Sequence, residues 1–217
     1  MKVAILSESE VDEAFIEIII SVILAESMER INRSFKSEGF QKALNVLPSM
    51  IRDLYYQTDA EAFAVVVDSD ETVIHNQSHE TNNTANTLSE TANCRLCQIK
   101  KVIEQTQQKI SIREERPMIK VAVGLAVPAI EAWYQYGIDA QASEAAWLVA
   151  SKERRYSHIK QQLKKAVYKV DRPSIPLMTK CAIEAANRLA NGLSDIETLF
   201  PGGFGSFAQD IRGWKNS

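Results

Sequence analysis

Acidic residues follow three apolar segments of the chain at spacings that suit a divalent cation. The clearest pair is Asp68 and Asp70, which stand two positions apart after the continuously apolar run 62–67. Side chains at i and i+2 of an extended strand point to the same side, so both carboxylates can face one ion. Such oxygen ligands suit Mg²⁺, which takes one or two carboxylates and keeps several waters. The pair therefore predicts a Mg²⁺ or Mn²⁺ site; the alternative is that these acids are solvated or cap a following helix.

Three more acids stand in comparable places along the chain. Glu8 and Asp12 follow the first apolar run, and Glu131 follows the third. In an open α/β sheet, ligands bind outside the carboxyl ends of the strands. If each apolar run is a strand of one parallel sheet, these three acids meet Asp68 and Asp70 at the same end of that sheet.

The order of the expected elements indicates an α/β fold. Strands are expected at 2–7, 62–67 and 118–127, because these runs are β-branched or continuously apolar, as in parallel strands covered on both faces. Helices are expected around 11–25, 41–53 and 94–108, and along most of the chain from 129 onward. These elements predict a small, mostly parallel sheet flanked by helices, with a helical C-terminal region. The expected organisation is an α/β core at 1–140, with the polar stretch 72–91 as a surface loop or insertion, and a helical region at 141–217 packed on it.

The first expected helix is unusually apolar. From Ile18 to Ala25 it carries apolar side chains on nearly all sides. This pattern predicts that the helix is buried on two sides or contacts another subunit, which leaves a homo-oligomer open.

The composition indicates a folded domain. It argues against a protein that coats nucleic acid, a disulfide-rich scaffold and a membrane protein. The 217 residues are 45% hydrophobic and 24% charged, which suits a sizeable core. A net charge of −3 and a pI near 5.7 argue against binding nucleic acid or anionic membrane through the overall field. Three cysteines cannot form a disulfide framework. The apolar run 14–25 is too short to cross a bilayer, and residues 1–7 lack the features of a signal peptide. We expect a cytoplasmic protein that does not enter membranes.

Four short motifs occur in order along the chain: 8–15 (ESEVDEAF), 68–70 (DSD), 127–133 (VPAIEAW) and 168–173 (YKVDRP). Together they resemble the motifs of Toprim domains, and the third is similar to a segment of the RloB-like Toprim proteins. The RloB-like and OLD-nuclease-like families occur in bacterial defence loci. The resemblance implies a Toprim-like α/β fold and metal-dependent hydrolysis of phosphodiester bonds in DNA or RNA.

The resemblance also implies roles for individual residues. Mg²⁺ or Mn²⁺ would be held by Glu8, Asp68, Asp70 and Glu131. The implied catalytic set is Glu8, Asp12, Asp68, Asp70, Glu131 and Lys169. The implied function is that of a nuclease effector in an anti-phage defence system, controlled by an ABC-type or SMC-like ATPase partner.

Two positions depart from the family pattern and support a second hypothesis. Ser9 stands where the family usually has glycine, and Gly137 stands where an acid often follows Glu131. Under this hypothesis the chain is a catalytically silent Toprim-like subunit that docks on a partner through the apolar helix 18–25.

Two histidines and two cysteines form a second candidate metal site. His75 and His79 are four positions apart, and Cys94 and Cys97 are three apart. Imidazoles and thiolates at such spacings suit tetrahedral zinc, which would make the chain a zinc-stabilised interaction module. The alternative is that the histidines are solvated in the polar stretch and the cysteines lie one turn apart on a helix without a metal.

The basic segment 152–172 offers a further site. Lys160 with Lys164, and Lys165 with Lys169, have the i,i+4 spacing that places side chains in a stripe along a helix. Such a stripe could contact the phosphates of a nucleic acid, with Lys169 near the scissile phosphate. The alternative is a solvated helix face.

Overall fold

The computed structural model describes residues 1–31, 39–76, 78–81, 85–136, 138, 143–153 and 156–215. At its centre is a parallel four-stranded sheet with the order β2-β1-β3-β4. The strands are β1 (Lys2–Leu6), β2 (Glu29–Arg30), β3 (Ala62–Asp68) and β4 (Lys120–Ala126). The three longer strands are the expected ones, whereas the two-residue strand β2 was not expected. β3 and β4 pair along their whole length, from Ala62 opposite Lys120 to Asp68 opposite Ala126.

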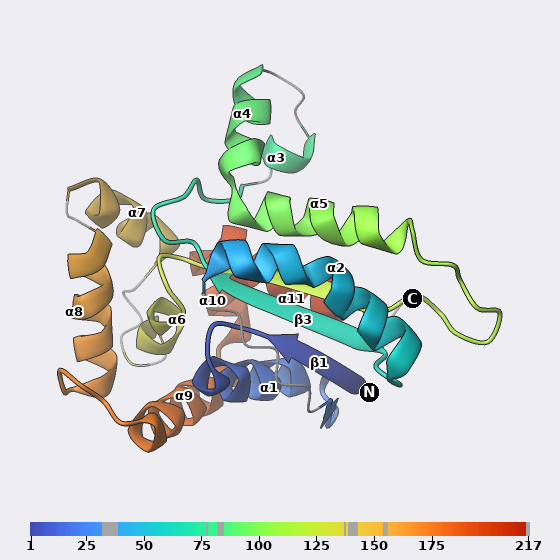
Figure 1. Ribbon diagram of the computed structural model, residues 1–217. Helices are drawn as coiled ribbons and strands as arrows, with labels where there is room; N and C mark the ends of the chain where they lie inside the picture. Colours follow the sequence, from blue (N-terminus) through green and yellow to red (C-terminus); the bar gives the residue numbers. More distant parts are fainter. Residues whose placement is uncertain are drawn as a thin grey trace.

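Helices cover both faces of this sheet (Figure 1). One face carries α2 (Phe40–Gln57) and α5 (Arg95–Gln107). The helices that contribute to the core on the other face are α1 (Glu10–Leu24), α6 (Glu131–Tyr136), α8 (Tyr156–Tyr168), α9 (Ile175–Leu189), α10 (Leu193–Leu199) and α11 (Ser206–Gly213), with a π-helical turn η1 (Pro201–Gly205). The remaining helices are α3 (Ser78–Thr81), α4 (Ala85–Asn93) and α7 (Glu144–Glu153). This architecture confirms the expected α/β class and is compatible with a Toprim-like fold. None of the helices in the described ranges is long and apolar enough to span a bilayer.

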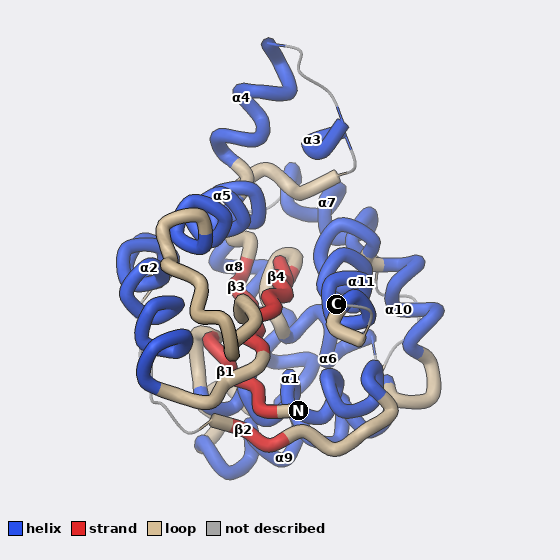
Figure 2. The backbone as a smooth tube through the Cα atoms, turned by 90° about the vertical axis from the view of Figure 1, so that its right-hand side faces the viewer, coloured by secondary structure: helices blue, strands red, loops and turns tan. Residues whose placement is uncertain are grey.

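Alternate side chains of the strands fill two hydrophobic cores, one on each face of the sheet. Figure 2 shows the strands between α2 and α5 on one side and α6 and α11 on the other. In β1, Val3 and Ile5 face the α1 side, while Ala4 and Leu6 face the α2 side. Every residue of β3 is buried. A strand covered on both faces can be apolar at consecutive positions, which explains the continuous run that precedes Asp68.

The apolar helix α1 lies between the sheet and α9. Phe15, Ile16, Ile19 and Ile20 are fully buried in the same core as the C-terminal helices. Burial on two sides, by the sheet and by α9 of the same chain, therefore explains why this helix is so apolar. It was the first of the two alternatives predicted for the helix.

The outer strand β4 is covered along its edge by α11. The Asp210 carboxylate accepts a hydrogen bond from the backbone N–H of Val123 at 3.2 Å. The ammonium of Lys120 donates to the carbonyl of Trp214. Exposed edge strands present unpaired backbone groups to other chains, and the bond to Asp210 satisfies one such group of β4, the N–H of Val123.

The turn η1 brings two glycines against the main chain at the carboxyl end of the sheet. A Cβ on Gly203 would lie 2.0 Å from the carbonyl oxygen of Leu125, and one on Gly202 would lie 2.1 Å from that of His75. The carboxylate of Glu144 accepts a hydrogen bond from the N–H of Gly202 at 2.9 Å, and its burial raises the pKa of this carboxyl to about 7. Only a residue without a Cβ can approach a carbonyl so closely. The C-terminal segment thus packs directly on β4 and on the loop after β3.

The polar stretch 72–91, predicted as a surface loop or insertion, is partly helical. It contains α3 and most of α4, and the side chains of His75 and His79 are buried. Both histidines turn toward the N-terminus of α5, where they contact the two cysteines. The prediction that these histidines are solvated is therefore wrong.

Candidate functional site

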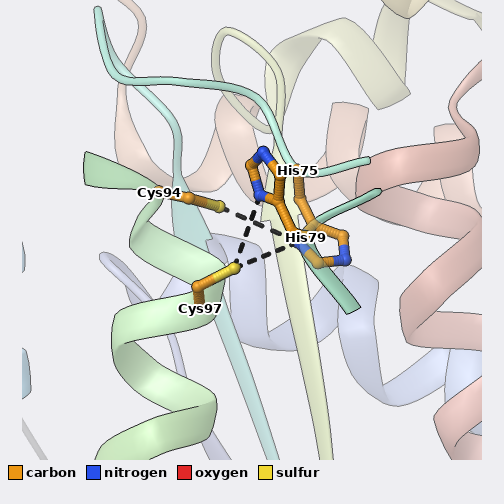
Figure 3. A group of neighbouring side chains, drawn as sticks. All are labelled: His75, His79, Cys94 and Cys97. Atoms are coloured by element: carbon orange, nitrogen blue, oxygen red, sulfur yellow. Dashed lines mark hydrogen bonds between the residues drawn. The ribbon is translucent and has the colours of Figure 1, made fainter. Parts of the chain in front are cut away.

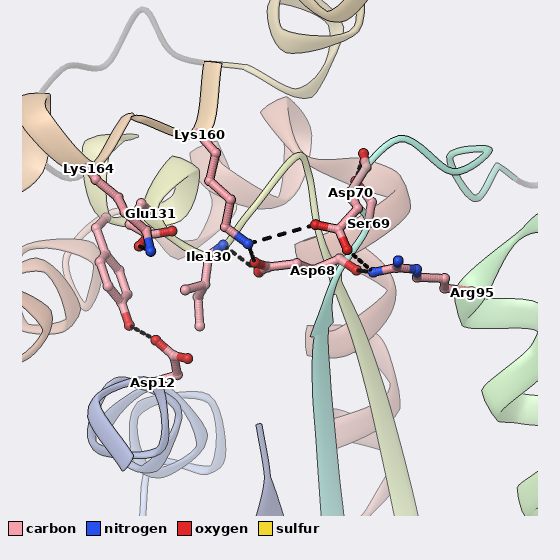
Figure 4. A network of polar contacts seen from close by, with 10 residues as sticks. Asp12, Asp68, Ser69, Asp70, Arg95, Ile130, Glu131, Lys160 and Lys164 are labelled. Carbon is pink, nitrogen blue, oxygen red and sulfur yellow. Dashed lines mark hydrogen bonds and ion pairs between the residues drawn. The ribbon is translucent and has the colours of Figure 1, made fainter. Parts of the chain in front are cut away.

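Asp68 is the last residue of β3 and lies at the centre of the polar contacts at the carboxyl end of the sheet (Figure 4). One carboxylate oxygen accepts the backbone N–H of Ile130 at 2.9 Å, and the other accepts the Lys160 ammonium at 2.5 Å. Burial raises the pKa of Asp68, and Lys160 offsets part of that rise. Burial lowers the pKa of Lys160, but the charges of Asp68, Glu8 and Asp70 outweigh that effect and raise it above its ordinary value, so this lysine stays charged.

Asp70 is held beside Asp68 by the turn that follows β3. The N–H groups of Ser69 and Asp70 donate to the carbonyls of Ala126 and Pro128, which extends the pairing of β3 with β4 into this turn. Asp70 has a φ of 49°, a left-handed conformation that aspartate tolerates better than most residues. Its carboxylate lies 3.7 Å from the Lys160 ammonium.

Arg95 joins this turn to α5. Its guanidinium donates to the carboxylate of Asp70 at 2.5 Å and to the carbonyl of Asp68 at 2.7 Å. The guanidinium also lies over the ring of Phe40, 4.7 Å from its centroid. These contacts fix the direction of the Asp70 side chain.

Two further carboxyl groups lie near Asp68, those of Asp12 on α1 and Glu131 on α6. Asp12 is buried and accepts a hydrogen bond from the Tyr134 hydroxyl at 3.0 Å, and burial raises the pKa of Asp12 to about 7. Glu131 is also buried, so desolvation and then the charge of Asp68 raise its pKa. The ammonium of Lys164 lies 3.7 Å from the Glu131 carboxylate.

Glu8 lies at the exposed rim of these acids, in the turn after β1. Desolvation and the charges of Asp68 and Asp70 raise the pKa of Glu8, while Lys160 lowers it. The next residue, Ser9, is the N-cap of α1, where its hydroxyl accepts the N–H of Asp12 at 3.3 Å. Ser9 thus begins the helix that carries Asp12.

The structure brings five of the six proposed catalytic residues into one electrostatically coupled group, which we call the acid cluster. Its members are Glu8, Asp12, Asp68, Asp70 and Glu131. The sixth, Lys169, is exposed at the C-terminal end of α8, with a φ of 60°. Lys160 and Lys164 are the lysines whose ion pairs reach the cluster, so neither is simply a solvated residue. Gly137 lies outside the described residues.

Five residues of this site were missed as partners of the acids: Arg95, Tyr134, Lys160, Lys164 and Tyr168. The spacing of Lys160 and Lys164 placed them on one helix face, but nothing local indicated that this face turns toward the strand ends. Both tyrosines are buried. The hydroxyl of Tyr134 donates to Asp12, and burial together with the nearby charge of Glu131 raises the pKa of Tyr168.

The second candidate site, which we call the His–Cys group, consists of His75, His79, Cys94 and Cys97 (Figure 3). One ligand atom from each residue lies within 4.8 Å of all the others, so this group could bind a metal. In the described part of the chain, no other set of three or more His, Cys, Asp or Glu side chains meets this criterion, and the acid cluster does not. Hydrogen bonds, first from Cys97 and then from His75, lower the pKa of the Cys94 thiol to about 4.

The two sites are adjacent. Cys94 is the N-cap of α5, Arg95 is the first residue of that helix, and Cys97 lies in its first turn. The helix turn that supplies two possible metal ligands therefore also supplies the guanidinium that contacts Asp70. No protein-family model, curated protein or solved structure matches this chain.

Proposed function

We propose that the chain is a metal-dependent nuclease whose active centre is the acid cluster. The observation that carries this proposal is the meeting of five carboxyls, from the ends of β1, β3 and β4, with the ammonium of Lys160 between Asp68 and Asp70. Ligand sites in parallel α/β sheets lie at this end of the strands. The order of the Toprim-like motifs supports the same chemistry.

The donor set fits Mg²⁺ or Mn²⁺. Glu8, Asp68 and Asp70 would hold one ion, and Asp12 with Glu131 would complete a second position. The pKa values of Glu8, Asp12, Asp68 and Glu131 are all raised, because these acids are desolvated close to like charges. A divalent cation relieves that repulsion, and hard oxygen donors are the ligands it prefers.

The bound ion would stabilise the negative charge that develops on the phosphate during hydrolysis. The chain's own groups have separate tasks. Lys160 lies where its ammonium can turn from Asp68 toward a phosphate oxygen, and Lys164 can support it from the next turn of α8. Glu8 is exposed at the rim, so the alternative to its role as a ligand is that of a general base, which would accept a proton from the attacking water.

The resemblance to defence-associated Toprim proteins supports a nucleic-acid substrate and control by an ATPase partner. The net charge of −3 argues for weak binding of nucleic acid by the chain alone. Delivery of the substrate within a complex is consistent with both features.

One observation favours the alternative of a catalytically silent subunit. Asp68 and Asp70 already pair with cations of the chain itself, Lys160 and Arg95. In a silent subunit these ion pairs would be permanent and would only hold the strand ends together.

Cleavage of plasmid, single-stranded DNA and total RNA in Mg²⁺ or Mn²⁺ tests the proposal. We expect the wild type to cleave at least one of these substrates, alone or with its ATPase partner. Asp68→Asn and Glu8→Gln should each reduce the rate about 100-fold or more. The first removes a negative ligand of the charge-stabilising ion, and the second removes either a ligand or the general base. Asp53→Asn, an exposed acid on α2, is the matched control and should leave the rate unchanged.

Binding of Mg²⁺ provides a second measurement that does not need the substrate. A bound ion raises the melting temperature of the wild type by mass action, and Asp68→Asn should abolish that rise. Binding without cleavage would favour the silent subunit. A wild type that neither binds Mg²⁺ nor cleaves would contradict the nuclease proposal.

A further inference from the structure

The His–Cys group has the dimensions of a tetrahedral zinc site. Cys97 Sγ lies 3.4 Å from His75 Nδ1 and 3.5 Å from His79 Nδ1, and Cys94 Sγ lies 3.9 Å from His75 Nδ1. With Zn–S bonds of about 2.3 Å and Zn–N bonds of about 2.0 Å, tetrahedral geometry separates sulfur and nitrogen ligands by about 3.5 Å. The three measured separations are close to this value.

The surroundings of these side chains also favour a bound metal. Cys94 and the side chain of His79 are fully buried, and His75 is 5% exposed. The second nitrogen of His79, Nε2, lies 3.6 Å from the carboxylate of Glu90. A carboxylate on the far nitrogen of a ligating histidine orients the ring and makes it a better donor. Glu90 therefore lies on the side of His79 away from Cys97, and the side-chain amide of Asn76 lies 3.4 Å from the same nitrogen.

We propose that His75, His79, Cys94 and Cys97 bind one Zn²⁺ ion in a closed structural site that ties the loop after β3 to the N-terminus of α5. Two thiolates and two imidazoles complete a tetrahedral shell, so no position is left for a water or a substrate. The proposal does not depend on nuclease activity, because none of its ligands belongs to the acid cluster.

The zinc site acts on the neighbouring acids through Arg95. His75 and His79 come from the chain that leaves Asp70, and Cys94 and Cys97 flank Arg95 on α5. The metal therefore fixes the distance between the two segments joined by the Arg95–Asp70 ion pair. The carbonyl of His75 packs against Gly202, so the C-terminal turn η1 supports the same loop from behind.

A competing chemistry is a redox pair, because Cys94 and Cys97 form a C-x-x-C motif at a helix N-terminus. In that case the two cysteines would form a disulfide and the imidazoles would carry no metal. The two interpretations predict different species in the folded protein, so one set of measurements separates them.

The experiment is metal analysis of full-length protein purified with a reductant and exposed to Zn²⁺, followed by gel filtration. We expect about one zinc per chain in the wild type, as in a four-ligand structural site. Cys97→Ser and His79→Gln should lose most of that zinc. The chain offers matched controls, Cys181→Ser on α9 and the exposed His158→Gln on α8, which should retain it.

Cobalt titration of the wild type keeps the proposal testable if the ligand variants do not fold. Co²⁺ in a tetrahedral S₂N₂ site gives strong ligand-field bands in the visible and a thiolate-to-cobalt band in the near ultraviolet, and Zn²⁺ should bleach both. Folded wild type that takes up neither metal would overturn the proposal. A Cys94–Cys97 disulfide as the stable species, found by mass spectrometry after metal exposure, would overturn it in favour of the redox pair.

Discussion

Gly203→Ala is expected to lower the free energy of unfolding by about 3 kcal/mol or more. The added methyl group would lie 2.0 Å from the carbonyl oxygen of Leu125 and 3.3 Å from the carboxylate of Glu144. Leu125 is in β4, which is paired along its length with β3, so the carbonyl cannot move without disturbing the sheet. Overpacking a rigid contact destabilises proteins by about 1–3 kcal/mol, and a backbone obstacle of this kind belongs at the upper end. Urea unfolding at equilibrium measures the change.

Gly213→Ala is the matched control for this substitution. A Cβ at Gly213, in the last turn of α11, meets nothing within 4 Å. This change should be neutral or should stabilise the protein by about 0.5 kcal/mol, because alanine restricts the unfolded chain. Equal stabilities of the two variants would contradict the close packing of η1 on β4.

Asp12→Asn is expected to stabilise the protein at pH 8 by about 4 kcal/mol in the absence of added divalent cation. Burial raises the pKa of Asp12 from 3.8 to about 7, and Asp68, Glu131 and the hydroxyl of Tyr134 face its carboxyl. Between these two values the folded protein keeps the proton while the unfolded chain has lost it. The contribution of Asp12 to stability is therefore full below about pH 4 and falls by about 1.4 kcal/mol per pH unit until about pH 7.

Asparagine is neutral at every pH, and its amide oxygen can still accept the hydrogen bond from Tyr134. Its advantage over aspartate should therefore grow from pH 5 to pH 8 and level off there. Unfolding in urea at several pH values measures this trend, with the exposed Asp53→Asn as a control that should show none. If the advantage of Asp12→Asn did not change with pH, the burial of an ionisable group at this position would be refuted.

Much of the fold and half of the site could be read from local sequence. The runs that became β1, β3 and β4 are apolar because both faces of the sheet are covered, and that pattern is visible without a structure. An acid directly after such a run has to lie near the carboxyl end of the sheet, which predicted the neighbourhood of Glu8, Asp68 and Glu131.

The cations of the site could not be predicted in the same way. Lys160 is 92 positions from Asp68, and its approach depends on how α8 folds back over the strand ends. Arg95 is 25 positions from Asp70 across a polar stretch without a periodic pattern. A basic residue on a helix carries no local sign of its partner, so the sequence favoured Lys169 near the phosphate while the structure places Lys160 between the acids.

The His–Cys group could be predicted from the sequence only in part, for a different reason. The ligand types and their pairwise spacings were visible, and the two cysteines lie one helical turn apart as expected. Whether the histidine pair meets the cysteine pair depends on the path of the chain through α3 and α4, which spacing does not determine. Strand β2 was missed for a simpler reason, since two residues are too few to establish a period.

The contacts of α11 with β4 limit how the protein can assemble with others. Proteins that recognise extended peptides often do so by β-augmentation, in which the peptide adds a strand to an open sheet edge. At β4 the N–H of Val123 is already bonded to Asp210, and α11 covers the strand along its edge. A peptide would have to displace this helix before it could pair there. A partner that bound on this side of the molecule would therefore meet the side chains of α11 rather than the backbone of β4.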